Sequence, residues 1–520
     1  MITNNIASIT DGGGGGIALW NSNPIVGKNT ISNNLARFGG AIQCYESSPI
    51  IEDNLLLDNS AESGGGIVCW NYSSPILNGV TFRNNTATNW ADGAIHSING
   101  NLQIDNCIFE ENSDVVFGGA INFYCSDTLN ITYQLIMTNT LFYNNSGEQG
   151  GGTWAGCGDS AKVDVLIEKC SFINNFAEKS GGLWITGGSN KVDFTLSNSI
   201  FSANEALDFS AGCSFNRCRG TVSNCLFNSN AASTGGGNWN SGGSSVWSNS
   251  IVDFMNCTFA DNTASYGAGL TVGYGGNAII TNCIFWNNSV DQIALDTYDN
   301  VGGTLTVNYC DIEGGEAAVN IIDSSLCTLD WGEGNIDNEP DYENPGSGEY
   351  HLQNTSPCIG TGIDSMMING NMCYCPTTDI EGNPRPDPEG SMPDMGAYES
   401  ELANPVGVEE DKTVQPTEYA FYQNYPNPFN PTTLIKFQIP ELSFVTLKLY
   451  DILGREVATL VNEEKTVGSY EVEFNTSTLS GYIFAKGGYA TSVYFYQIQA
   501  VPTGRQVGSF IETKKMVLIK

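Results

Sequence analysis

Apolar residues recur at every second position in short segments along the first 310 residues of the chain. Each segment carries two apolar residues two positions apart, then a small residue, and then an apolar ring two positions further on. This spacing places successive side chains on opposite faces of an extended chain, so each segment predicts a short β-strand with one buried face. The residues predicted to lie in the core include Ile104, Phe109, Ile167, Phe172, Leu196 and Phe201.

A repeated Phe-x-x-Asn motif gives these segments a common register. Its phenylalanines are Phe82, Phe109, Phe142, Phe172, Phe201, Phe227, Phe259 and Phe285, at intervals of 26 to 33 residues. The asparagine series extends upstream to Asn59, Asn34 and Asn5. After the asparagine comes a polar turn and then a glycine pair, as at Gly39-Gly40, which opens a second strand.

A unit of this size, with strands and turns but no helical pattern, cannot bury its apolar face alone. Successive units must therefore stack, each pairing in parallel with the next. The sequence predicts an all-β parallel β-helix of about a dozen coils, spaced about 4.8 Å apart along its axis.

Two columns of the repeat have structural interpretations. Stacked asparagine amides hydrogen-bond from coil to coil, and asparagine also tolerates left-handed turns. The small-residue column holds Cys257, Cys283 and Cys310 in successive coils. Because parallel Cα–Cβ vectors fit disulfide geometry poorly, buried free thiols are favoured there over disulfides.

A different pattern occupies the C-terminal hundred residues. The segments NYPNPFNPTT (424–433), LKLYDILGREVATLV (447–461), GSYEVEFN (468–475) and VYFYQI (493–498) alternate apolar and polar residues between turns. This pattern predicts a small immunoglobulin-like β-sandwich at 421–520. Residues 400–420 are polar and read as a linker.

Three resemblances to known families rest on these motifs. Phe-x-x-Asn with Gly-Gly-Ala-Ile resembles the repeats of polymorphic outer-membrane proteins and, more broadly, bacterial right-handed β-helix surface proteins, over residues 1–310. The segment 311–399, with TTDIEGNPRP and DMGAYE, resembles the choice-of-anchor segment that closes many such helices. Residues 421–520 resemble the type A C-terminal sorting domain of the type IX secretion system, although the stretch before Val493 is longer than usual there.

The last resemblance implies an exported protein, extracellular or on the outer cell surface, whose partner is the type IX secretion machinery. Export of this kind requires a signal peptide, but Met1 is followed by polar Thr3, Asn4 and Asn5. The sequence is therefore expected to lack its signal peptide and its first coils or cap. No run of 18 apolar residues predicts a transmembrane helix.

The net charge of the chain restricts the classes of ligand that it can bind. The net charge is −36; residues 404–520 carry 10 basic and 12 acidic residues, which leaves residues 1–403 with 10 against 44. Such an acidic body disfavours nucleic acid and anionic membrane surfaces as partners. With His96 and His351 as its only histidines, the chain offers almost no material for a histidine-based triad or zinc site, and no metal site is assigned.

One charged patch stands out. Lys162, Lys191 and Arg217 share one outward column of three adjacent coils, and Asp164, Asp193 and Arg219 share another. These residues could act on an acidic polysaccharide, with aspartates holding Ca²⁺ and a basic residue removing the uronate α-proton in a lyase reaction. The alternative is that the cations offset repulsion between stacked aspartates.

Two outward columns of aromatic rings follow the glycine pairs. The first holds Trp20, Tyr45, Trp70 and Tyr124, and the second holds Trp154, Trp184 and Trp239 together with His96, which is expected to be a plain surface residue. Exposed rings along a rod suit the faces of sugars. The alternative is that a loop or terminal segment covers them.

The sequence thus favours a secreted, surface-attached, adhesin-like protein that is not an enzyme and contacts glycans or other cell-surface material through its aromatic columns. The alternative is a polysaccharide lyase or hydrolase that uses the charged patch. No cofactor is expected. Asp379, Glu381 and Asp394 could bind Ca²⁺, but they form no complete loop motif, and a plain turn is favoured.

Overall fold

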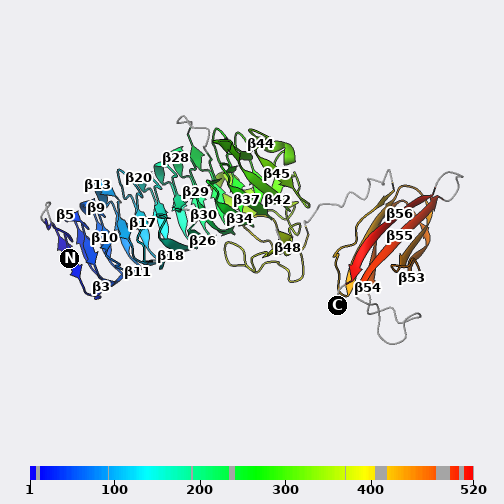
Figure 1. The fold of residues 1–520 in the computed structure, drawn as a ribbon, viewed down its shortest axis with the longest axis horizontal. Helices are drawn as coiled ribbons and strands as arrows, with labels where there is room; N and C mark the ends of the chain where they lie inside the picture. Colours follow the sequence, from blue (N-terminus) through cyan, green and yellow to red (C-terminus); the bar gives the residue numbers. More distant parts are fainter. Residues whose placement is uncertain are drawn as a thin grey trace. The chain divides into compact units, whose positions relative to one another are not determined.

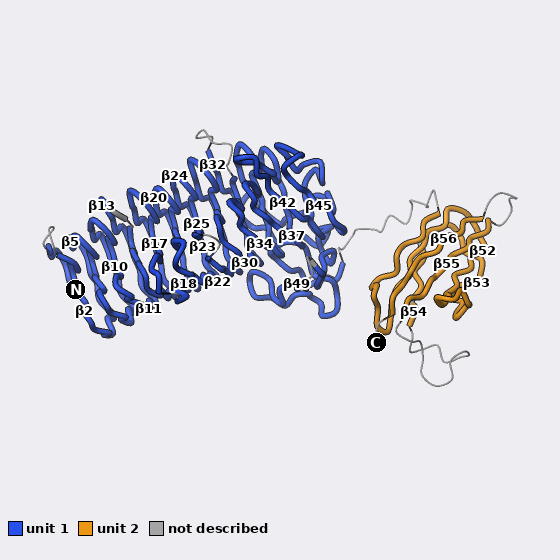
Figure 2. Tube along the Cα trace, viewed as in Figure 1, with its two compact units in different colours: residues 1–408 blue, residues 409–520 orange. Residues whose placement is uncertain are grey.

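The computed structural model describes residues 1–7, 12–91, 93–129, 131–188, 191–233, 241–368, 371–404, 419–475, 492–502 and 509–518. It divides into two compact units, Met1–Val408 and Glu409–Lys520 (Figure 2). The first unit is the predicted solenoid. Its strands form three 12-stranded parallel sheets, in which each strand pairs with its counterparts in the preceding and following coils (Figure 1).

Sheet 1 carries the Phe-x-x-Asn motif. Its strands in order are β1 (Ile2–Thr3), β4 (Thr30–Ser32), β8 (Leu55–Leu57), β12 (Thr81–Arg83), β16 (Ile108–Glu110), β19 (Leu141–Tyr143), β23 (Ser171–Ile173), β27 (Ile200–Ser202), β31 (Leu226–Asn228), β35 (Thr258–Ala260), β38 (Ile284–Trp286) and β43 (Asp311–Ile312).

Sheet 2 follows the glycine pairs. Its strands are β2 (Ile17–Trp20), β6 (Ile42–Tyr45), β10 (Ile67–Trp70), β14 (Ile95–Ile98), β17 (Ile121–Cys125), β21 (Thr153–Cys157), β25 (Leu183–Thr186), β29 (Cys213–Asn216), β33 (Ser244–Trp247), β36 (Leu270–Val272), β39 (Ile293–Leu295) and β44 (Val319–Ile321).

Sheet 3 carries the alternating apolar pairs. Its strands are β3 (Ile25–Gly27), β7 (Ile50–Glu52), β11 (Ile76–Asn78), β15 (Leu102–Asp105), β18 (Thr132–Thr138), β22 (Lys162–Glu168), β26 (Val192–Ser197), β30 (Cys218–Ser223), β34 (Ile251–Met255), β37 (Asn277–Thr281), β42 (Thr304–Asn308) and β45 (Thr328–Trp331).

Shorter ladders lie between sheets 1 and 2. One consists of β5 (Leu35–Phe38), β9 (Ser60–Ser63) and β13 (Thr86–Ala91); the other of β20 (Ser146–Gln149), β24 (Phe176–Lys179), β28 (Glu205–Asp208) and β32 (Ala231–Ala232). These ladders position the turns that lead into the glycine pairs.

The interior matches the predicted register. The eight phenylalanine rings from Phe82 to Phe285 are fully buried and stack coil on coil, with centroids 4.4 to 5.0 Å apart and planes within 8° of parallel. Ile104, Ile167 and Leu196, on sheet 3, are also fully buried. The core assignments made from the sequence are therefore confirmed.

The asparagine ladder is confirmed as well, from Asn5 to Asn288. In a typical step, Asn145 donates from both its backbone N–H and its Nδ2 to Oδ1 of Asn175, each at 3.0 Å. The left-handed residue is the one before the ladder asparagine, such as Asn144 (φ 55°) or Asn174 (φ 54°). The suggestion that the ladder asparagines themselves adopt left-handed turns is thus wrong; their role is the amide ladder.

The cysteine column holds free thiols, as predicted. The fifteen cysteines whose side chains the structure describes are free, and Cys257, Cys283 and Cys310 are fully buried on successive coils. In place of a disulfide, the backbone N–H of Cys257 donates to Sγ of Cys283 at 3.5 Å, and that of Cys283 donates to Sγ of Cys310 at 3.4 Å.

The segment after β45 folds back along the outer face of sheet 1. It contains the hairpins β46 (Tyr342–Asn344) with β47 (Glu349–Leu352) and β48 (Ser365–Ile368) with β49 (Asn371–Tyr374). Tyr350 and Tyr398 pack on the outward side chains of Leu226 and Ala260. Arg385 is fully buried in an ion pair with Glu399 at 2.8 Å and bonds to Asn224 on the sheet 1 side of β30. The last coils of sheet 1 are thereby covered on both faces.

The second unit consists of two antiparallel sheets. One joins β50 (Ala420–Phe421), β51 (Thr432–Ile439) and β54 (Gly468–Asn475), and the other joins β53 (Glu456–Lys465), β52 (Ser443–Tyr450), β55 (Ser492–Pro502) and β56 (Phe510–Leu518). Their alternate side chains share one core that includes Ile435, Leu447 and Tyr496. This is the small β-sandwich expected from the apolar alternation.

Candidate functional site

The first aromatic column runs along sheet 2 as predicted. Trp20, Tyr45 and Trp70 are register partners on β2, β6 and β10, and Tyr124 follows on β17 after one intervening residue, Ile98. The Trp20 ring is 60% exposed and stacks on Tyr45 with centroids 4.5 Å apart. Sequence reasoning missed a further member of this column, Trp247, which lies on β33 and is buried.

The second column differs from its prediction. Trp154 and Trp184 are register partners on β21 and β25, and the column continues back through Asn122 and His96. However, Trp154 is only 9% exposed and His96 only 8%. The expectation of an exposed Trp154 ring and a plain surface His96 is therefore wrong. Trp239 lies outside the described residues.

The burial of these rings has a local cause in the turns before the glycine pairs. Three turns carry a phenylalanine that leans on the outer face of sheet 2. Phe38 meets Trp70 edge-on at 4.4 Å, Phe117 meets Trp154 at 5.3 Å, and Phe209 stacks on Trp184 at 5.9 Å. The predicted alternative, in which a loop covers the rings, is confirmed in part. Single phenylalanines cover individual tryptophan rings, and space remains between these phenylalanines.

That space is a groove of about 650 Å³ on the outer face of sheet 2. Along the rod from Phe38, the register partners in the next two coils are the small residues Ser63 and Ala91. We call this space the aromatic groove. Its walls are formed by Phe38, Ser63, Trp70, His96, Ile98, Phe117, Asn122, Tyr124 and Trp154.

Three polar atoms on the wall of the aromatic groove are buried and make no hydrogen bond: Nε1 of Trp70, Nε1 of Trp154 and Oδ1 of Asn122. Two are donors and one is an acceptor. Asn122 is 3% exposed. Sequence reasoning missed it because polar residues are common at outward strand positions. None of the lining residues is an acid, lysine or arginine. The wall thus carries no permanently charged side chain, which suits a neutral ligand.

The charged patch lies on sheet 3 and faces outward as predicted. Asp164, Asp193 and Arg219 are register partners on β22, β26 and β30. The two aspartates line a depression of about 260 Å³ together with Gln134, Ile136 and Leu166. Lys162, Lys191, Arg217 and Arg219 do not line it, and the Lys191 ammonium donates to the backbone oxygen of Asp159. Among the described residues, no ion pair joins two members of the patch. In the described residues, the patch therefore places no basic side chain in the lining of the hollow and shows no direct ion pair between its aspartates and its cations.

The acidic residues near the end of the first unit act as turn anchors. Both oxygens of Asp379 accept hydrogen bonds, from the backbone N–H groups of Glu381, Asn383 and Glu399 and from Nδ2 of Asn383. Asp394 accepts from the N–H groups of Gly360 and Ser400, and burial raises the pKa of its carboxyl to about 6. These bonds hold the backbone of the turns in place.

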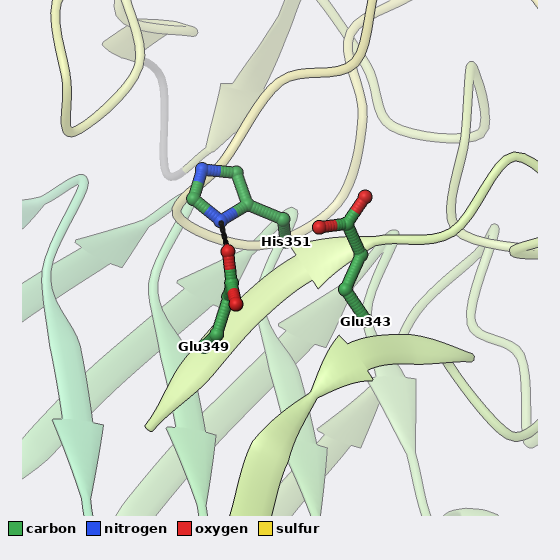
Figure 3. A group of neighbouring side chains, drawn as sticks. All are labelled: Glu343, Glu349 and His351. Atoms are coloured by element: carbon green, nitrogen blue, oxygen red, sulfur yellow. Dashed lines mark ion pairs between the residues drawn. The ribbon is translucent and has the colours of Figure 1, made fainter. Parts of the chain in front are cut away.

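A further cluster, missed by the sequence analysis, lies on hairpin β46–β47. Glu343, Glu349 and His351 bring their ligand atoms within 4.8 Å of one another (Figure 3). Nδ1 of His351 lies 3.9 Å from Glu349, and Nε2 lies 3.2 Å from Glu381. Both glutamates are exposed. This is the arrangement of a surface ion-pair cluster around one imidazole.

Comparison with known families follows the division into two units. Residues 1–109 and 65–253 match the family model described as a right handed beta helix region. Residues 423–501 match the model of the secretion system C-terminal sorting domain. No curated protein matches the chain. Within the described part of the chain, no helix is long and apolar enough to cross a membrane.

Proposed function

Because the chain is a right-handed parallel β-helix followed by a secretion-system C-terminal sorting domain, we propose that it is an adhesin-like protein that binds glycans at the cell surface and is not an enzyme. The sorting domain marks the protein for export by type IX secretion, to the cell surface or the medium. The proposal concerns what the exported rod does there.

The observation that carries the proposal is the aromatic groove. Rings from two outward columns and from two turns surround a volume of about 650 Å³, which is large enough for more than one sugar unit. Aromatic faces stack on the C–H faces of sugars, and each such contact contributes on the order of 1 kcal/mol beyond area burial. Upstream, the Trp20–Tyr45 stack extends the aromatic surface along the rod.

The lyase alternative finds less support. β-Elimination needs a base beside the bound uronate, yet the hollow next to Asp164 and Asp193 is lined by no lysine or arginine. Two carboxylates in that hollow also repel a polyuronate. The charged patch is therefore better suited to a solvated face of the rod.

Affinity electrophoresis of the full chain against neutral and acidic polysaccharides tests the proposal. The intact protein should be retarded by at least one neutral polysaccharide, and the double variant Trp70→Ala/Trp154→Ala should migrate freely. The matched control is Lys162→Ala, which lies on sheet 3 outside the groove wall and should be retarded as the intact protein is. If no polysaccharide retards the intact protein, the ligand is not a glycan and the proposal fails.

Export is tested separately. Deletion of residues 421–520 should leave the β-helix unit folded, because that unit has its own core. The truncated protein should then accumulate in the periplasm of a host with type IX secretion, when supplied with a signal peptide. Appearance of the truncated protein at the cell surface would contradict the sorting role.

A further inference from the structure

The aromatic groove presents a specific set of hydrogen-bonding atoms in an otherwise apolar wall. Nε1 of Trp154 and Oδ1 of Asn122 are both buried and without a partner, and both residues are at least nine-tenths buried. A buried donor or acceptor that has given up water without gaining a partner destabilises the folded protein. Because these two atoms line a groove, a ligand can complete them, and their donor and acceptor character then describes the ligand that fits.

The residues that carry the donor and the acceptor are neighbours in the sheet. Asn122 on β17 and Trp154 on β21 are register partners, so their Cα atoms are separated by about one coil, roughly 4.8 Å. They do not hydrogen-bond to each other. A second donor, Nε1 of Trp70, lies on the wall of the same groove. A ligand group that fits here must accept from an indole N–H and donate to an amide oxygen.

The rest of the wall restricts that group further. Apart from Ser63, His96 and Asn122, the lining residues are Ile98 and aromatic side chains, so most of the wall is apolar. A sugar hydroxyl both donates and accepts, so it can bond to the indole N–H and to the amide oxygen, but it brings no apolar group to the surrounding carbon. An acetamido group satisfies all three demands at once. Its carbonyl accepts, its N–H donates, and its methyl group packs against apolar surface.

We infer that the aromatic groove recognises the acetamido group of an N-acetylhexosamine unit in a neutral glycan. This inference rests on the proposed glycan-binding function and names its ligand class. The carbonyl oxygen accepts from Nε1 of Trp154, the N–H donates to Oδ1 of Asn122, and the methyl group lies against Ile98 and the flanking rings. Neutral glycans are favoured over acidic ones because the body of the chain, residues 1–403, carries 44 acidic against 10 basic residues.

Tryptophan fluorescence titration of the full chain with two uncharged oligomers of equal length tests the inference. The probes are a β-1,4-linked N-acetylglucosamine tetramer and a β-1,4-linked glucose tetramer, at 0.15 M salt to screen the net charge. We expect the acetylated tetramer to bind at least about tenfold more tightly, a ratio typical of a site whose polar groups are left unpaired by the wrong ligand.

Two variants locate the effect. Trp154→Phe removes the indole N–H but keeps a ring, and Asn122→Ala removes the acceptor. Each should weaken binding of the acetylated tetramer several-fold and leave binding of the glucose tetramer unchanged. The matched control is Trp184→Phe, in the same column but outside the groove wall, which should change neither affinity. Circular dichroism and thermal melting check that each variant is folded; should Trp154→Phe not fold, Asn122→Ala carries the test.

The outcomes separate the two proposals. Equal affinity for both tetramers, or preference for the glucose tetramer, would overturn the acetamido assignment while leaving a glycan-binding function in place. Failure of both tetramers to bind, although another polysaccharide retards the protein, would likewise overturn the assignment alone. Failure of every glycan would overturn the proposed function itself.

Discussion

The inside of sheet 1 and the outside of sheet 2 belong to the same coils, yet they use aromatic residues in opposite ways. Inside, the same residue recurs: eight phenylalanines stack from Phe82 to Phe285, all fully buried. Outside, the first aromatic column changes from coil to coil, through Trp70, Ile98, Tyr124 and Gly156. In the interior every coil offers the same packing environment, so the same residue recurs. The outward column is not constrained in this way, and its residues differ from coil to coil.

The difference shows where a binding site can form on a solenoid. A uniform stack leaves no hollow, because each ring rests on the next at van der Waals distance. The aromatic groove exists because small and large residues alternate outside: Ser63 interrupts the turn phenylalanines, and Ile98 lies between Trp70 and Tyr124. Residues that repeat in every coil therefore form the scaffold, and the aromatic groove lies where the repeat is interrupted.

The largest effect is expected for an interior ring. Phe172→Ala should lower the free energy of unfolding by about 3 to 5 kcal/mol, since it opens a cavity between Phe142 and Phe201 in the stack. Denaturation with guanidinium chloride measures the change. Leu166→Ala, on an outward and partly exposed position of the same coil, should cost less than about 1 kcal/mol. Equal losses for the two variants would contradict the contrast between interior and exterior.

The asparagine ladder should be the next most sensitive. Asn175→Ala removes the acceptor of Asn145 and the donor to the carbonyl of Phe142, all buried. With about 1 to 3 kcal/mol for each buried group left unpaired, a loss of about 2 to 4 kcal/mol is expected. Asn174→Gly is the control: its φ of 54° suits glycine, so stability should change by less than about 1 kcal/mol. A larger loss for Asn174→Gly would show that the turn, not the ladder, sets the register.

Asp311 gives a third test, because the segment that follows β45 covers this outward position. Asp311 is the outward register partner of Ile284, but Cys358 and Asn338 enclose and bond to it, and burial raises the pKa of its carboxyl to about 7. The folded protein thus holds this proton to a higher pH than the unfolded chain, whose aspartates titrate near pH 4. The stabilising contribution is complete below about pH 4 and is lost as the pH rises to about 7.

The free energy of unfolding of the native protein should therefore be about 2 kcal/mol lower at pH 8 than at pH 5, after the pH-dependent change measured for Asp311→Asn is subtracted. The variant provides the baseline because burial also raises the pKa of Asp394 to about 6 and of Glu399 to about 7. Identical pH profiles for the native protein and Asp311→Asn would show that Asp311 stays ionised when folded.

The smallest effects belong to exterior residues that nothing covers. Lys191→Ala and Arg217→Ala should each change stability by less than about 0.5 kcal/mol, because exposed charges contribute little. Retention on a neutral polysaccharide should also remain unchanged, since neither residue lines the aromatic groove. Loss of retention in either variant would move the binding surface from sheet 2 to sheet 3.

Much of the fold was readable from the repeat. The strand register, the buried phenylalanines, the amide ladder and the free thiols all follow from columns of like residues, as Phe172, Asn175 and Cys283 illustrate. The members of the aromatic columns that the structure describes also lie along sheet 2 as predicted, although Trp154 is buried there. In a solenoid each residue meets mainly its counterpart one coil away, so the spacing of residues along the chain already encodes the contact.

The site depended on what the repeat does not encode. Whether Trp154 is exposed is decided by Phe117, a turn residue 37 positions earlier, and the partnerless oxygen of Asn122 matters only because a hollow lies in front of it. Similarly, Asp311 became a buried carboxyl because residues near 340 and 358 fold back over sheet 1. The sequence by itself determined the scaffold through contacts of constant period. The tertiary structure alone decided which outward side chains are covered, since that depends on turns of variable length and direction.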